Sequence, residues 1–348
     1  MSSQDLRSPR HLAVSGNIPT GLYRALGEPV RGLGRLGLRL LPWLLVLTAI
    51  VLAGRAGASP GRRAAAQVEL SGTAVHLPFD LDEGHVLVET WLDGEGPFRF
   101  QLDTGAGVEA CLDTELAERL GLQSVGTAWH DDGSGRDPVR RSLVALQELR
   151  VGGLRAENVT ALVADLHWLG RPGAEPVDGV LGFDLFHDVL LTIDYPARRI
   201  ELARGELSSE EAHVIDYDDS RGLPDVELRL AGRRIRALID TGARSALSLP
   251  DRWRRSLPLR DEPSLVGTVR TVNNEFQLLA ARLRSPLEVA GYRLRDVAAS
   301  FAVGDDEVLV GGGLLRHFRL TVDQVNRRLR LLHDGERESK LRDRVASR

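Results

Sequence analysis

The sequence predicts an all-β protein that contains two homologous units and only short helices. Two observations lead to this prediction. A strand-like apolar run ends in Asp-Thr-Gly-Ala twice, at residues 103–106 and 240–243. The elements around both copies recur in the same order. A collinear repeat of this length indicates duplication of one folding unit.

A hairpin is predicted before each Asp-Thr-Gly-Ala copy. Residues 86–94 and 226–232 are strand-like runs that enter a Gly-containing turn, and each turn returns as the strand that carries the aspartate. An ionisable carboxylate directly after a buried strand costs free energy unless it is hydrogen-bonded or used. Asp103 and Asp240 are therefore candidate functional groups.

Three downstream elements also recur. They are residues 180–182 with 309–311, residues 191–194 with 320–323, and residues 198–200 with 327–329. These pairs are 129 positions apart, whereas the aspartates are 137 positions apart, so the second unit is shorter between its motifs. Part of the extra length is residues 165–173, which predict a surface loop near the functional residues. His167 and Trp168 either line a subsite there or are solvated.

This order of elements resembles the lobe of a retropepsin-like (pepsin-related) aspartic protease, over about residues 75–333. The resemblance is specific in the paired Asp-Thr-Gly-Ala motifs and in the elements that end at Gly182 and Gly311. It implies two acid-protease-type β-barrel lobes related by pseudo-twofold symmetry and fused in one chain, as in the bacterial two-lobed form. It also implies a peptide or protein substrate, no cofactor, no metal, and a monomer that is a pseudo-dimer.

The chemistry explains why two copies are needed. Peptide hydrolysis without a metal needs a base that activates water and an acid that protonates the substrate oxygen and the leaving nitrogen. Two carboxylates a few ångströms apart share one proton and supply both roles. Asp103 and Asp240 are the predicted catalytic pair of an aspartic endopeptidase, and neither is the permanent acid.

Two alternatives remain open at this point. A non-catalytic peptide-binding or envelope-scaffold module can use the same fold, because fold does not imply function. The separation of the two carboxylates distinguishes this module from a protease, since a shared proton needs them about 3 Å apart. A glycosidase pairing needs a wider separation and does not explain the symmetry.

The resemblance also assigns roles to the residues that follow each aspartate. Thr104 and Thr241 are expected to hydrogen-bond across to the opposite lobe and to hold the loops rigid. Gly105 and Gly242 let the backbone approach the carboxylates closely.

Four further residues support the two loops. Gly182 and Gly311 resemble the glycines that pack behind each loop. Ala106 and Ala243 stand where pepsins have Ser or Thr. Losing a hydroxyl donor raises the pKa values of the pair, so we expect a mildly acidic rather than a strongly acidic optimum.

Residues 126–141 and 267–281 stand where the protease family has its flaps, which close over substrate and exclude water. Trp129 is the residue that we nominate to contact substrate, and the alternative is that it packs under its hairpin. No tyrosine stands in residues 126–141, so the flap tyrosine of pepsin cannot be carried over.

The N-terminal segment predicts export. An apolar run at residues 40–53 follows Arg31, Arg35 and Arg39, which is the pattern of an export signal. The run is shorter than the ~20 residues that span a membrane comfortably. A cleaved signal peptide, an uncleaved membrane anchor within residues 36–54, and a buried core helix remain alternatives. Either export reading places the lobes outside the cytoplasm, in the periplasm or beyond.

These patterns divide the chain into five parts. They are an N-terminal extension at 1–58, a linker at 59–69, a first lobe at 70–205, a second lobe at 206–333 and a charged tail at 334–348. A net charge of −4 gives no reason to expect a nucleic-acid partner. The single cysteine, Cys111, excludes an internal disulfide framework, and the nine histidines lack metal-ligand spacing.

Overall fold

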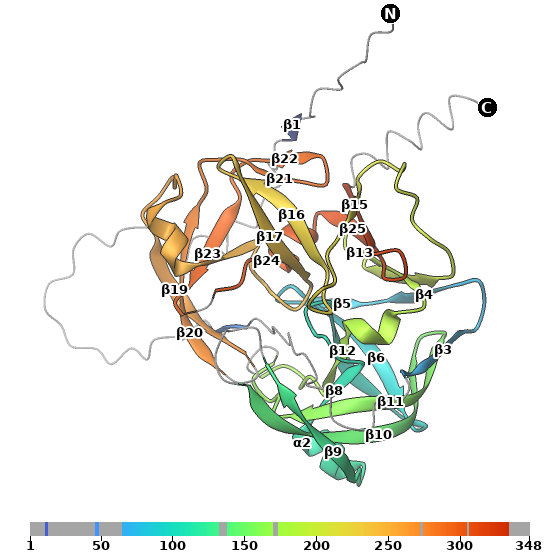
Figure 1. Cartoon of the computed structure of the whole chain (residues 1–348). Coiled ribbons are helices and arrows are strands. Elements are labelled where there is room, and N and C mark those ends of the chain that lie inside the picture. Colours follow the sequence, from blue (N-terminus) through green and yellow to red (C-terminus); the bar gives the residue numbers. More distant parts are fainter. Residues whose placement is uncertain are drawn as a thin grey trace, which may run out of the picture.

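The computed structural model describes residues 11–12, 46–48, 65–131, 138–169, 173–271, 274–304 and 306–333. Within these ranges the chain forms three β-sheets and a few short helices (Figure 1). The all-β prediction with two lobes is therefore confirmed. Each lobe has a sheet of its own, and the third sheet is shared.

The first lobe is a nine-stranded sheet. Eight strands follow the order β3-β11-β8-β12-β7-β6-β10-β9, and the ninth, β5, pairs with β6 outside this order. Its strands are β3 (Gln67–Leu70), β5 (Asp80–Asp82), β6 (His85–Leu92), β7 (Glu95–Asp103), β8 (Ala110–Asp113), β9 (Ser124–His130), β10 (Val139–Val151), β11 (Leu154–Ala164) and β12 (Gly179–Gly182). An additional pairing between β10 and β11 closes the sheet on itself, as a barrel lobe requires. Helix α2 (Thr114–Arg119) follows β8, and the 3-10 turn η2 (Phe183–Phe186) follows β12.

The second lobe is an eleven-stranded sheet with the order β1-β22-β21-β16-β17-β24-β18-β23-β20-β19-β2. Its strands are β1 (His11–Leu12), β2 (Val46–Thr48), β16 (Asp225–Leu230), β17 (Arg233–Asp240), β18 (Leu247–Pro250), β19 (Ser264–Arg270), β20 (Glu275–Arg282), β21 (Leu287–Val289), β22 (Tyr292–Leu294), β23 (Ala298–Ala302) and β24 (Leu309–Gly311). The 3-10 turn η3 (Asp251–Arg255) follows β18, and helix α3 (Gly312–Leu315) follows β24. Strands β16, β17, β18 and β24 repeat the arrangement of β6, β7, β8 and β12.

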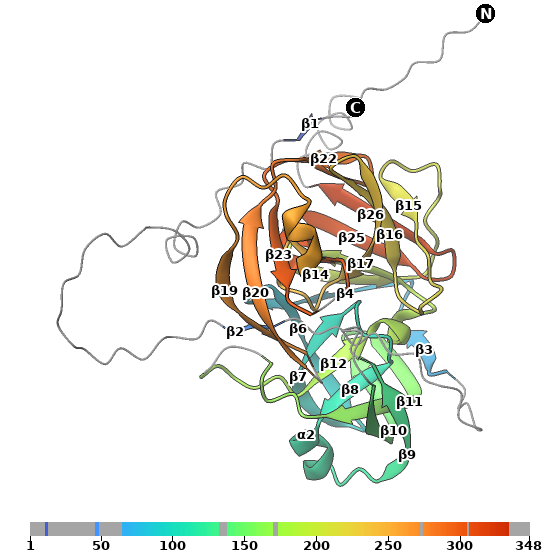
Figure 2. The same ribbon diagram turned by 60° about the vertical axis from the view of Figure 1, so that its left-hand side comes forward.

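A six-stranded sheet joins the lobes, in the order β15-β26-β25-β13-β14-β4 (Figure 2). Its strands are β4 (Ala74–Pro78), β13 (Leu190–Asp194), β14 (Arg199–Ala203), β15 (Val214–Asp216), β25 (Phe318–Asp323) and β26 (Arg328–His333). The lobes meet where β13 and β25 run antiparallel and Thr192 lies opposite Thr321. Their hydroxyl oxygens are 3.0 Å apart. Because these threonines are equivalent in the repeat, the pseudo-twofold axis passes between them.

Two apolar clusters hold the first lobe together. The main cluster extends through both lobes and the shared sheet, and includes Leu102, Leu191 and Ile239. The second cluster lies on the other face of the first-lobe sheet and comprises Leu87, Ala106, Cys111, Leu162, Ala164, Leu166, Leu169, Val177 and Val180. Leu166 and Leu169 belong to the described part of the predicted loop 165–173, so residues 165–169 are packed against the lobe, although His167 is exposed.

The linker prediction is wrong for residues 67–69. These residues begin β3, which pairs antiparallel with β11 because Val68 is buried against the first lobe. Most of the predicted export segment, the two flap tips at 132–137 and 272–273, and the charged tail lie outside the described residues. In the part that is described, no helix is long and apolar enough to cross a membrane.

Candidate active site

Two equivalent strands deliver the predicted catalytic residues to one place. Strand β7 ends at Asp103 with β12 parallel beside it, and Gly182 lies opposite Asp103. Strand β17 ends at Asp240, and Gly311 of β24 lies opposite it in the same way. A Cβ atom at Gly182 would lie 2.0 Å from the Val108 carbonyl oxygen, so only glycine fits behind the loop.

The two carboxyl groups are fully buried at the lobe interface, and they lie close enough that each affects the pKa of the other. The glycine of each motif packs against the carboxyl of the other lobe. A Cβ atom at Gly105 would lie 2.7 Å from Asp240 Cγ, and one at Gly242 would lie 2.3 Å from Asp103 Oδ2. The structure therefore brings Asp103, Asp240 and both glycines into one compact site.

Backbone N–H groups hold one oxygen of each carboxyl. Gly105 N donates to Asp103 Oδ1 at 2.8 Å. Gly242 N and Ala243 N both donate to Asp240 Oδ1, at 2.8 and 2.9 Å. The other oxygen, Oδ2, of each carboxyl is buried and has no hydrogen-bond partner among the described residues. Buried polar atoms are nearly always satisfied, so these two oxygens indicate a chemical role.

Burial raises the pKa of both carboxyls. The pKa of Asp103 rises to about 7, although the Gly105 N–H opposes the shift. The pKa of Asp240 is raised well above its ordinary value, first by burial and then by the negative charge of Asp103. The titration belongs to the pair, which therefore retains a shared proton in mildly acidic solution. These upward pKa shifts have the direction expected from Ala106 and Ala243, and burial is their first cause.

The motif threonines link the two loops with four hydrogen bonds. Thr104 Oγ1 donates to the Ile239 carbonyl at 2.6 Å and accepts from Thr241 N at 3.1 Å. Thr241 Oγ1 donates to the Leu102 carbonyl at 3.0 Å and accepts from Thr104 N at 3.0 Å. All of these bonds cross between the lobes, as the resemblance implies. The carboxyl positions therefore depend on both lobes together.

A buried arginine beside the second motif is absent from the sequence prediction. Arg244 Nη1 lies 2.5 Å from Glu83 Oε2 of the first lobe, and Arg244 Nε lies 3.3 Å from His85 Nε2. Burial lowers the pKa of Arg244, and the charge of Glu83 opposes this shift. The available signal was a break in the repeat, because Gly107 occupies the equivalent position after the first motif.

Two hairpins occupy the predicted flap positions. Strands β9 and β10 form the first, and strands β19 and β20 form the second. The pairing in both is irregular at one point, next to Gly126 and next to Gly267. Trp129 is 57% exposed on β9, so it does not pack under its hairpin. Its role in substrate contact stays a prediction.

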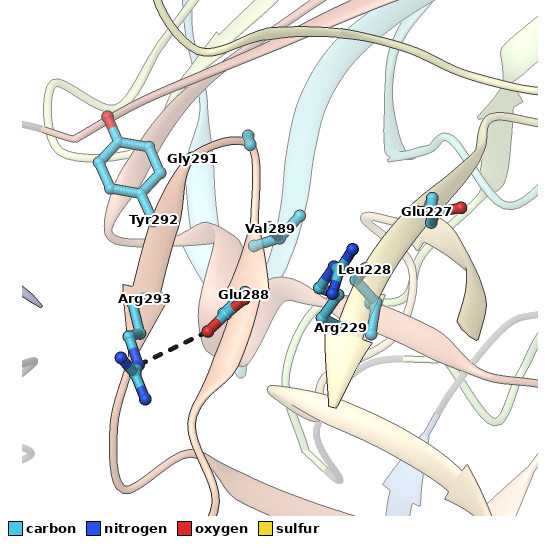
Figure 3. Close-up of a pocket in the computed structure, with 9 residues that line it drawn as sticks. Glu227, Leu228, Arg229, Glu288, Val289, Gly291, Tyr292 and Arg293 are labelled. Carbon is cyan, nitrogen blue, oxygen red and sulfur yellow. Dashed lines mark ion pairs between the residues drawn. The ribbon is translucent and has the colours of Figure 1, made fainter. Parts of the chain in front are cut away.

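A separate hollow of about 230 Å³ lies on the outer part of the second lobe (Figure 3). It is lined by β16 and by the hairpin of β21 and β22, where Glu288 and Arg293 form an ion pair at 3.6 Å. Neither Asp103 nor Asp240 lines this hollow.

Among the described residues, no group of three or more His, Cys, Asp or Glu side chains could hold a metal ion.

Comparisons with known proteins identify the family of the chain. The model of the aspartyl protease family matches residues 88–185 and 226–315, one segment in each lobe and together more than half of the chain. The chain therefore belongs to the aspartyl protease family. Among solved structures it is similar to a retropepsin-like aspartic protease from Rickettsia conorii. That match has 18% identity and a TM-score of 0.27, and it covers 40% of this chain and 96% of the other. No curated protein matches the chain.

Proposed function

We propose that the protein is an aspartic endopeptidase in which Asp103 and Asp240 together activate a water molecule for attack on a peptide bond. The observation that carries this proposal is the close approach of two buried carboxyls, one from each lobe, each packed against the motif glycine of the other lobe. Two carboxyls in such contact cannot both ionise easily, so one proton is shared. The pair then offers a base and an acid at the same time.

The proton movements follow from this state. The ionised member of the pair takes a proton from water as the water oxygen attacks the carbonyl carbon. The protonated member donates its proton to the carbonyl oxygen, which gives a tetrahedral intermediate. The carboxyl that took the water proton then passes it to the leaving nitrogen as the C–N bond breaks, and a hydroxyl proton of the intermediate returns to the other carboxylate. The N–H groups of Gly105, Gly242 and Ala243 hold the carboxyls in place during these transfers. Pre-organisation of this kind lowers the barrier because no group must reorient.

The proposed substrate is an extended peptide or protein segment that lies across the pair under the two flap hairpins. Backbone hydrogen bonds would hold it, and its side chains would enter pockets of each lobe. Trp129, exposed on the first hairpin, is the proposed flap contact. One chain supplies both aspartates, so we propose that the active form is a monomer.

Catalysis is favoured over the peptide-binding or scaffold alternative by the energetics of the pair. A binding module gains nothing from two buried carboxyls in mutual contact, since burial and repulsion both cost free energy.

We also propose export, with the N-terminal apolar run as a signal peptide or a membrane anchor and both lobes outside the cytoplasm. The arginines that precede this run support the proposal.

The test is cleavage of a diverse peptide library across pH by the wild type, Asp103→Asn and Asp240→Asn. We expect each substitution to reduce kcat/KM at least about 1,000-fold, in the range of general acid–base catalysis. Circular dichroism should show that both variants stay folded. The wild-type activity should fall on the acidic side at a pH above 3.8, the ordinary aspartate pKa. Unchanged cleavage by either variant, or a maximum below about pH 3, would contradict the proposal.

A further inference from the structure

Gln101 is a buried polar side chain that the hydrolysis step does not use. It lies on β7 two residues before Asp103, so both side chains point to the same face of the sheet. Gln101 is fully buried. In the part of the chain that the structure describes, neither its amide oxygen nor its amide nitrogen has a hydrogen-bond partner.

The neighbours of Gln101 on this face are apolar. Leu87 of β6 and Val180 of β12 lie beside it in register, and Cys111 of β8 lies beside Val180. All three belong to the second apolar cluster. An unpaired primary amide among such side chains costs free energy, so packing does not explain the presence of glutamine.

The second lobe has an apolar residue at the equivalent position. Leu238 lies two residues before Asp240, and it pairs with Leu309 of β24 just as Gln101 pairs with Val180. Leu238 is also fully buried. The two sides of the catalytic pair therefore differ by one amide group.

The flap hairpins also differ in polarity, with a charged residue in the first lobe where the second lobe has an apolar one. Arg141 pairs with Ala128 in the first hairpin, and Phe276 pairs with Val269 in the second. Both pairs lie two positions beyond the irregular point, so they are equivalent. Burial raises the pKa of the Cys111 thiol to about 12, and the positive charge of Arg141 opposes this shift. Arg141 therefore acts on the face of the sheet that carries Gln101.

An extended peptide places successive side chains on opposite sides of its backbone. A peptide bond centred on the catalytic pair therefore directs its two flanking residues to opposite lobes, one toward Gln101 and the other toward Leu238. Asp103 and Asp240 are as deeply buried as Gln101. A peptide that reaches the carboxyls must therefore displace the groups that cover them, and Gln101 lies only two residues away on the same strand face.

We propose that Gln101 determines specificity by hydrogen-bonding a substrate side chain that carries an amide or carboxylate oxygen, on the first-lobe side of the cleaved bond. The second-lobe side, at Leu238, accepts an apolar side chain. This inference rests on the proposed endopeptidase function. A site that hydrogen-bonds its ligand discriminates strongly against analogues that lack the group, because its own polar atoms are then left unpaired.

The test compares wild type, Gln101→Leu and Leu238→Gln on peptides that vary only at the two residues flanking the cleaved bond. For the wild type we expect Asn, Gln, Asp or Glu to be preferred over Leu at one flanking position by about 10-fold or more in kcat/KM. Gln101→Leu should remove that preference and leave the other position unchanged. Leu238→Gln should add a polar preference at the other position. Arg141→Met should reduce the rates for Asp and Glu more than those for Asn and Gln.

Thermal stability without substrate is a second readout. Gln101→Leu should raise Tm, because it removes an unpaired amide from an apolar cluster. A lower Tm would show that the fold itself satisfies the amide, and it would overturn the inference. A cleaving wild type whose preferences are unchanged in Gln101→Leu would also overturn it, while the endopeptidase proposal would stand. If no peptide is cleaved, the endopeptidase proposal fails. The same peptides are then tested for binding to Asp240→Asn and to the double variant Asp240→Asn/Gln101→Leu. A polar preference in binding that Gln101→Leu removes would support the role of Gln101, and an unchanged preference would overturn it.

Discussion

In the first lobe, Asp103 Oδ1 accepts one backbone N–H from its own loop, whereas Asp240 Oδ1 in the second lobe accepts two. The sequences of the two motifs are identical over four residues. The loops differ because Ala243 N turns to the carboxyl, while Ala106 N donates to the backbone carbonyl of Asp103 at 3.3 Å. Identical motifs therefore do not make identical carboxyls.

The residues just outside the motifs diverge further. Arg244 contacts Glu83 of the opposite lobe, and the first lobe has Gly107 at the equivalent position. The threonine bonds, in contrast, are matched on both sides. The duplicated lobes have stayed symmetrical where the two loops must meet, and they have diverged in the surroundings. Each prediction below tests one side of this comparison against the other.

The largest effect is expected from the motif glycines. A methyl group at Gly242 would lie closer to Asp103 than one at Gly105 would lie to Asp240, at 2.3 Å against 2.7 Å. Displacing a carboxyl by such an amount should cost at least about 100-fold in kcat/KM. Gly242→Ala should be more damaging than Gly105→Ala. Gly72→Ala is the control, since its nearest neighbour would lie at 3.8 Å. Full activity in Gly242→Ala would show that the loops are not packed as described.

The threonines should give equal effects from the two lobes. Thr104→Ala and Thr241→Ala each remove two buried hydrogen bonds and leave backbone groups unpaired. We expect each to lower the free energy of unfolding by about 1–3 kcal/mol, measured by urea denaturation. Thr→Ser at either position keeps the hydroxyl and should recover most of the loss. Clearly unequal losses would mean that the link is not symmetrical.

Arg244 tests the asymmetric side. Arg244→Met removes an ion pair in which the arginine is 7% exposed and Glu83 is 33% exposed. Because Glu83 retains some solvent, we expect a loss of about 1–2 kcal/mol in unfolding free energy. A double-mutant cycle with Glu83→Gln should show that the two losses are not additive. Additive losses would mean that the pair does not couple the lobes.

The last prediction concerns stability and pH. The raised pKa of Asp240 means that the folded chain binds this proton more tightly than the unfolded chain does. Above pH 3.8 the unfolded chain loses this proton while the folded chain still holds it, so the free energy of unfolding falls. The fall continues until the pH reaches the pKa of the folded state. Asp240→Asn should thus be more stable than wild type at pH 7. The expected gain is on the order of 1 kcal/mol for each pH unit that separates the folded pKa from the unfolded one. At about pH 3 to 4, near the ordinary aspartate pKa, the difference should nearly vanish. A constant difference across this range would contradict the raised pKa.

The repeat made the two lobes and the meeting of Asp103 with Asp240 predictable, because strand, turn and glycine positions recur in register in the sequence. The shared sheet was not predictable in this way. The pattern of Leu191 and Ile193 shows which face is buried, but it does not show that Thr321 lies opposite Thr192. Val68 likewise gave no sign of its partner strand.

The surroundings of the pair escaped prediction for a related reason. Arg244 and Gln101 each break the repeat, yet a break alone does not tell whether a side chain is buried. The contact of Arg244 with Glu83 appears only when the lobes are brought together, and the apolar cluster beside Gln101 appears only when the strands of the first lobe are paired. Deviations between equivalent positions are therefore the best sequence signal for asymmetric features of such a site.

The shared proton can be observed directly by a carboxyl-carbon NMR titration of protein labelled with [13C]aspartate, with Asp103→Asn and Asp240→Asn used to assign the two signals. If the pair holds a proton jointly, at least one carboxyl of the wild type will titrate well above 3.8. The pKa of Asp240 should then fall in Asp103→Asn, because the neighbouring charge that raises it is gone. Two signals that titrate independently near 3.8, each unaffected by loss of the other, would show that no proton is shared.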